Sequence, residues 1–104
     1  MPDLEVLPRT YRGPVPEWPL GPPASEREAQ LWAEMWQEPQ AAVWAEYQLA
    51  RQVGVHVRTL FEIESGRQGS AMRRVARSQA VSLLLTPASL RRGGYRVSPV
   101  EAVE

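Results

Sequence analysis

The sequence contains no cysteine and no lysine, and it has a single histidine, His56. The lack of cysteine excludes disulfide bonds and Cys/His zinc sites. The lack of lysine excludes a Walker A phosphate-binding loop and a Schiff-base lysine. No apolar run has the length of a membrane span, and the first residues lack the basic-then-apolar order of a signal peptide. We therefore expect a protein of the cytoplasm that contacts no membrane.

Catalytic side chains are also scarce. His56 has no cysteine partner and no nucleophile motif beside it, which predicts a surface or structural histidine. Glu62 and Glu64 are two residues apart and would point to different sides of a helix, so they do not form a paired-carboxylate site. We expect no enzymatic activity, no metal site and no cofactor.

The charges are present in equal numbers but are unevenly distributed along the chain. All twelve basic residues are arginine, and they balance twelve acidic residues to a net charge of zero. Residues 1–50 carry eight acids and three arginines, a net charge of −5, whereas residues 51–104 carry nine arginines and four acids, a net charge of +5. The sequence therefore predicts a molecule with an acidic and a basic part.

The prolines and tryptophans indicate how the chain is organised. A length of 104 residues allows one small domain, and four tryptophans argue against full disorder. Seven of the ten prolines lie in residues 1–23, which predicts a Pro-rich extended arm. Either Trp18 docks this arm on a neighbouring surface, or the arm is a disordered tail. We expect a small all-α helical domain over residues 24–97 and a flexible acidic tail over residues 98–104.

Two helices are predicted in the first half of that domain. Ser25 and Glu28 form an S-x-x-E capping box, which begins a helix that stops before Pro39. Residues 39–64 carry apolar side chains at three- and four-residue steps, which predicts a long central helix. Gly54 lies near its middle and would also suit a turn between two shorter helices.

Two further helices follow. The glycines of residues 65–69 predict a loop, and Ser70 is the expected N-cap of a helix over residues 71–85. One face of that helix is expected to be buried, formed by Met72, Val75, Ala76, Gln79, Ala80 and Leu83. Thr86 and Pro87 form a cap followed by a proline at the first helical position, so a short helix is expected up to the two glycines at 93–94, followed by an extended exit.

A long helix in so small a chain has more apolar surface than one copy can cover. Trp32, Trp36 and Trp44 are expected in or near the core and in a subunit interface. We therefore expect a homo-oligomer, with cyclic symmetry as the expected form.

An acid-free segment carries the most informative charges. Between Gly66 and Val100 there is no acidic residue and there are seven arginines, namely Arg67, Arg73, Arg74, Arg77, Arg91, Arg92 and Arg96. Unopposed guanidinium groups bind phosphates through charge-assisted hydrogen bonds, so these seven residues are the predicted DNA-binding residues. The alternative is that they pair with the acidic half of the same or an adjacent subunit.

The order of these segments resembles a known family. The pattern LW-x3-W-x2-PQA at residues 31–41 and the LTP turn at residues 85–87 are similar to those of small terminase subunits from tailed phages of actinobacteria, and the resemblance covers residues 16–99. It differs from that pattern at residues 93–95, where GGY stands in place of a larger residue and a tryptophan, and in a third helix without acids. The resemblance implies a ring-like oligomer in the host bacterium. It also implies binding of double-stranded viral DNA and its delivery, for genome packaging, to a large terminase subunit that holds the ATPase and nuclease.

Two other interpretations stay open. The pattern LA-x3-GV-x3-TL-x2-IE-x-G at residues 49–66 is similar to the helix-turn-helix of phage-repressor-like regulators, in which the glycine makes the turn. A continuous helix through Gly54 favours the terminase interpretation, whereas a sharp turn there favours the regulator. The third interpretation is a phage assembly or connector protein that does not bind DNA and uses the arginines for subunit contacts.

Overall fold

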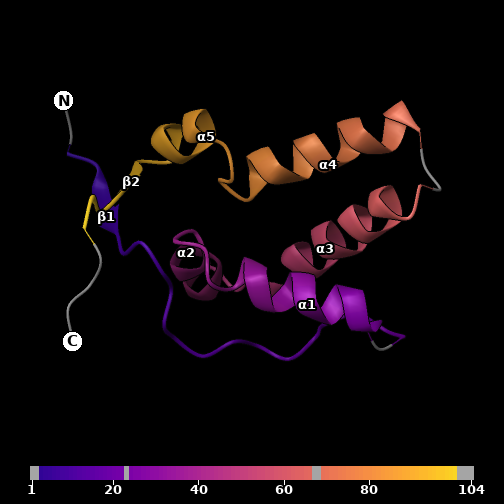
Figure 1. The fold of residues 1–104 in the computed structure, drawn as a ribbon. Coiled ribbons are helices and arrows are strands. Elements are labelled where there is room, and N and C mark those ends of the chain that lie inside the picture. The colour runs from indigo at the N-terminus through magenta and orange to yellow at the C-terminus, as the bar shows by residue number, and fades with distance from the viewer. Residues whose placement is uncertain (1–2, 23, 67–68, 101–104) are drawn as a thin grey trace.

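The computed structural model describes residues 3–22, 24–66 and 69–100, and its fold is mostly helical, as predicted. The helices are α1 (Glu26–Met35), α2 (Ala41–Glu46), α3 (Ala50–Glu64), α4 (Ser70–Ser82) and α5 (Pro87–Arg92). Two short strands, β1 (Glu5–Leu7) and β2 (Tyr95–Val97), pair in parallel with Glu5 opposite Tyr95. Figure 1 shows α3 between α1 and α4, with α4 and α5 forming one row. Within these residues, no helix is both long enough and apolar enough to cross a membrane.

The start of α1 follows the sequence prediction. The Ser25 hydroxyl accepts a hydrogen bond from the backbone N–H of Glu28 at 3.2 Å, and the Glu28 carboxylate accepts one from the backbone N–H of Ser25 at 3.0 Å. The other carboxylate oxygen of Glu28 accepts a 2.8 Å bond from Nε of Arg58 on α3. One glutamate therefore caps α1 and joins it to α3.

The prediction of one long helix over residues 39–64 is wrong. The helical path stops after Glu46 and resumes at Ala50, and Gln48 between them has a positive φ of 57°. Trp44 and Val53 explain the break, because both are fully buried in the same core. Nine residues apart in an unbroken helix at about 100° per residue, they would point to opposite faces.

Gly54 does not make a turn. It lies inside α3, which is helical on both sides of it. A Cβ atom at this position would stand 2.8 Å from Cγ of Pro19, so the glycine allows the N-terminal segment to pack directly on the helix. The turn that the helix-turn-helix alternative needs at Gly54 is therefore missing.

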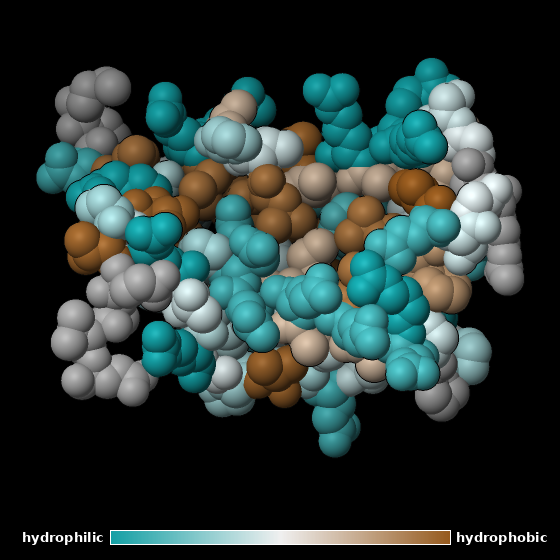
Figure 2. Space-filling model, viewed as in Figure 1, coloured by the Kyte–Doolittle hydropathy of each residue, from teal (hydrophilic) through white to brown (hydrophobic). Residues whose placement is uncertain are grey.

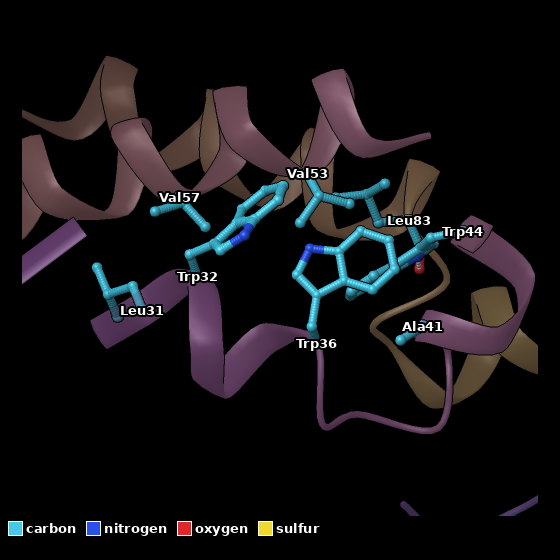
Figure 3. Close-up of a cluster of buried hydrophobic side chains, with 8 residues drawn as sticks. All are labelled: Leu31, Trp32, Trp36, Ala41, Trp44, Val53, Val57 and Leu83. Carbon is cyan, nitrogen blue, oxygen red and sulfur yellow. Dashed lines mark hydrogen bonds between the residues drawn. The ribbon is translucent and has the colours of Figure 1, made fainter. Parts of the chain in front are cut away.

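The core is built around tryptophan. The rings of Trp32 and Trp36 lie 5.6 Å apart and those of Trp36 and Trp44 5.5 Å apart, both edge to face. Figure 3 shows these rings facing Val53 and Val57 of α3. The prediction that the three tryptophans lie in the core is confirmed. Edge-to-face pairs of this kind each contribute about 0.5–1.5 kcal/mol beyond the burial of their area.

The proline-rich segment packs against the helices. Trp18 stacks edge to face on Trp32 at 5.3 Å, and the indole N–H of Trp32 donates to the carbonyl of Pro16 at 3.0 Å. The Arg58 guanidinium lies over the Trp18 ring, 5.3 Å from its centre. Tyr11 and Trp18 thus hold this part of the described chain against the core. The acids at 101 and 104, which define the predicted acidic tail, lie outside the described residues.

The last helices follow the prediction in part. Thr86 caps α5 through the N–H of Ser89, and Pro87 is its first residue, as predicted. The predicted cap of α4 is wrong, because Ser70 is already helical and Gly69 occupies the N-cap position without a side-chain hydrogen bond. The predicted extended exit after α5 is the strand β2.

Candidate nucleic-acid interface

Helix α4 is attached to the rest of the molecule through one narrow stripe. Ala76 is its one buried residue, and Met72 and Gln79 beside it are partly buried. Val75, which was expected on the buried face, is 46% exposed. Most of the surface of α4 is therefore open to solvent.

Three of the predicted arginines stand on this open surface. Arg73, Arg74 and Arg77 are all exposed. At about 100° per residue, Arg74 and Arg77 lie opposite the stripe of Met72 and Gln79, and Arg73 lies at its edge. Figure 2 shows hydrophilic side chains projecting along the edge of the molecule that α4 and α5 form.

The other predicted arginines lie farther along the same row. Arg91 and Arg92 are exposed in the last turn of α5, where the negative end of the helix dipole favours cations. Arg96 is exposed on β2, opposite Val6 in the strand register. The remaining predicted residue, Arg67, lies outside the described residues.

Among the residues that the structure describes, these six arginines form no ion pair with a carboxylate. Arginines elsewhere do so: Arg27 binds Glu64 through two hydrogen bonds of 2.8 Å, and Arg58 binds Glu28. The pairing of Arg58 lowers the pKa of Glu28, although burial acts in the opposite direction. The acidic half of the same chain therefore does not neutralise the α4 and α5 arginines within these ranges.

Two tertiary hydrogen bonds hold the junction between α4 and α5. Trp44 donates its indole N–H to the carbonyl of Leu83 at 2.9 Å, and the Gln40 amide donates to the carbonyl of Leu84 at 2.9 Å. These bonds hold the turn, in which Leu84 has a positive φ of 64°. A shallow hollow of about 220 Å³ lies at this junction, lined by Val81, Leu84, Ser89, Arg92 and Gly93.

The hollow lies between the arginines of α4 and those of α5. Val81 lies one helical turn after Arg77 on α4, and Arg92 of α5 lines the same hollow as Val81. Sequence analysis missed this relationship because it depends on the left-handed conformation of Leu84, and a leucine gives no local signal for that conformation.

The acidic residues of the first two helices lie in a different layer. Glu26, Glu34 and Glu46 are exposed on α1 and α2, and Glu38 is exposed in the loop between these helices. Figure 1 places α1 and the α4–α5 row on opposite sides of α3. The acids of α1 are therefore separated in space from the arginines of α4, whereas Glu5 and Glu46 lie near Tyr95 on β2 and, after burial, help to raise the pKa of that tyrosine.

A groove between α3 and α4 was also not predicted. It has a volume of about 540 Å³, and Val55, Arg51 and Ser78 are among its lining residues. Arg51 is exposed at this groove and belongs to neither arginine group. The groove joins residues more than twenty positions apart, which the spacing within one helix does not reveal.

The single histidine is held inside the protein by a side-chain hydrogen bond. Nδ1 of His56 donates to Oε1 of Gln79 at 2.9 Å, and burial lowers the pKa of this histidine. The described ranges hold no group of three His, Asp or Glu side chains placed to bind a metal ion. Comparison of the chain with family models, with curated proteins and with solved structures gave no match.

Proposed function

We propose that this protein binds double-stranded DNA through the surface formed by α4 and α5, and that it serves as the small terminase subunit of a tailed phage. The observation that carries the proposal is the set of six exposed arginines without a carboxylate partner among the described residues. Guanidinium groups bind phosphates through paired, charge-assisted hydrogen bonds. Each phosphate contact releases counterions, which supplies sequence-independent affinity.

The side chains of α4 and α5 favour a duplex over a single strand. Proteins that bind single strands stack bases on exposed aromatic rings. Neither α4 nor α5 contains an aromatic residue, and three of the four tryptophans are buried in the core. The α4 arginines span about 6 Å along the helix axis, from residue 73 to residue 77, over which a duplex carries several charges spaced about 1.7 Å apart.

The terminase assignment rests on the resemblance of residues 16–99 to that family. The helical path through Gly54 supports it over a helix-turn-helix regulator. In this role a ring of identical subunits would bind viral DNA and deliver it to the large subunit, which holds the ATPase and nuclease. The exposed acids of α1 and α2 are available for contacts between subunits or with the large subunit.

The test is a fluorescence-anisotropy titration of duplex DNA at several salt concentrations. Replacing Arg73, Arg74 and Arg77 together by Ala should weaken binding to every duplex and reduce the log-log salt slope by about 0.9 for each phosphate that the variant no longer neutralises. Arg51→Ala is the control, because Arg51 is also exposed but lies at the α3–α4 groove, outside the proposed surface. The control should bind as the wild type does.

Sedimentation velocity separates the remaining alternatives. A triple variant that binds DNA with the wild-type affinity and slope would refute the proposed contact. A triple variant that dissociates into smaller species would place the arginines in a subunit interface, as expected for an assembly protein.

A further inference from the structure

The hollow at the α4–α5 junction presents apolar surface at the centre of a basic region. Val81 is 40% exposed there, although its neighbour Leu83 is 2% exposed and belongs to the core. A valine also forms helix less readily than the alanines of α4, so helix propensity does not account for Val81 at this position. Leu84 forms a second apolar wall.

Ser89, the one uncharged polar side chain that lines the hollow, is already hydrogen bonded within the protein. The Ser89 hydroxyl donates to the carbonyl of Thr86 at 3.0 Å and accepts from the backbone N–H of Thr86 at 3.2 Å. Gly93 keeps one side open, because a Cβ atom there would meet Cδ2 of Leu84 at 3.2 Å. The hollow therefore suits an apolar group that needs no hydrogen bond.

Two positive charges define what surrounds that group. Arg92 lines the hollow, and Arg77 precedes Val81 by one turn of α4. No acid occurs in the described part of residues 66–100. A ligand that fits must place a small apolar group between negative charges.

Duplex DNA offers such a group in its major groove. The 5-methyl of thymine is the one apolar group among the hydrogen-bonding edges of the base pairs, and the phosphates of both strands flank it. The major groove is about 12 Å wide and admits a helix, and α4 is exposed on most of its circumference.

We propose that α4 lies in the major groove and that Val81 and Leu84 contact a thymine methyl while Arg77 and Arg92 bind the phosphates on either side. This inference rests on the proposed DNA binding. It makes Val81 a specificity-determining residue, whereas the arginines supply affinity for any sequence.

The test compares an alternating A·T duplex with the same duplex in which uracil replaces every thymine, since uracil lacks only the methyl group. Wild-type protein should bind the uracil duplex about fourfold more weakly, the value expected when one methyl group is no longer buried. Val81→Ala should bind both duplexes equally. The matched control is Val75→Ala, an exposed valine on another side of α4, which should keep the fourfold preference. Val81→Thr keeps the side-chain shape but replaces one methyl group by a hydroxyl, and it should reduce the preference.

Each contrary result separates this inference from the proposed function. Equal wild-type affinity for the two duplexes, together with a steep salt dependence, would refute the thymine contact and leave DNA binding in place. A change in sedimentation on Val81→Ala would show that Val81 contacts another subunit, which also refutes it. Absence of binding to any duplex would remove both proposals.

Discussion

The ring of Pro19 occupies the space that a side chain at Gly54 would need. A Cβ atom at residue 54 would stand 2.8 Å from Cγ of Pro19 and 3.4 Å from Cγ of Leu20. Glycine inside a helix costs about 1 kcal/mol relative to alanine. That cost is offset by contacts of the N-terminal segment with α3 and α1, including the stacking of Trp18 on Trp32.

Gly54→Ala should destabilise the protein, although alanine is the better helix former. The expected loss is about 1–3 kcal/mol in the free energy of unfolding, because the methyl group must displace Pro19 from a packed interface. Urea unfolding followed by circular dichroism measures it. Adding Pro19→Ala to Gly54→Ala should recover part of the loss, and stabilisation by the single substitution would contradict the packing.

Local features of the fold could be predicted from the sequence, whereas contacts between distant residues could not. The caps at Ser25 and Thr86 were predicted because each depends on residues within four positions. Gly54 resembled a turn signal because its reason, Pro19, lies thirty-five positions away. The exposure of the arginines followed from composition, but the hollow beside Arg92 depends on a turn fixed by tertiary hydrogen bonds.

Gln48 provides a second test of the break between α2 and α3. Its φ of 57° costs a residue with a side chain roughly 1–2 kcal/mol. Because Gln48 is exposed, Gln48→Gly should stabilise the protein by about 0.5–1 kcal/mol, after allowance for the greater freedom of glycine in the unfolded chain. Gln52→Gly in the regular part of α3 should instead destabilise by about 1 kcal/mol. If both substitutions changed the free energy of unfolding in the same direction, residue 48 would not be strained.

Glu28 should make stability depend on pH in the acidic range. The Arg58 hydrogen bond lowers its pKa in the folded protein below the ordinary 4.5, so the unfolded chain takes up a proton first as the pH falls. The stabilisation is complete above pH 4.5 and is lost as the pH falls through the folded pKa. Glu28→Gln keeps a capping side chain but removes the charge.

The expected cost of Glu28→Gln at pH 7 is about 1–2 kcal/mol, since a charged hydrogen bond is replaced by a neutral one. Stability of this variant should change less than that of the wild type between pH 5 and pH 3. Glu34→Gln is the control, because that carboxylate is 66% exposed and 3.9 Å from Arg27. An equal effect of the two substitutions would contradict the role of Glu28.

His56 should add a second pH dependence at a higher range. Burial lowers its pKa below the ordinary 6.5, and its hydrogen bond to Gln79 offsets only part of this. The unfolded chain therefore binds a proton first, and stability present above pH 6.5 is lost as the pH falls through the folded pKa. As the single histidine, its imidazole resonance can be followed directly by NMR. A pKa at or above 6.5 for His56 in the folded protein would contradict the burial of its side chain.

Trp36 and Trp44 form a matched pair for measuring one buried hydrogen bond. Both side chains are almost fully buried, at 1% and 0% exposure, and their rings contact each other. The indole N–H of Trp44 donates to the carbonyl of Leu83, whereas that of Trp36 has no hydrogen-bond partner among the described residues.

Replacing either tryptophan by phenylalanine removes the same atoms from the core and leaves a cavity in the place of those atoms. Trp44→Phe also leaves the carbonyl of Leu83 without its donor, which costs about 1–3 kcal/mol for a buried group. Trp36→Phe removes an N–H that was already unpartnered, so its only loss is packing. The difference between the two variants in urea unfolding should therefore be about 1–3 kcal/mol, with Trp44→Phe the less stable. Equal stabilities would mean that the Trp44 bond does not fasten the α4–α5 turn, and that the turn must be held by the Gln40 amide.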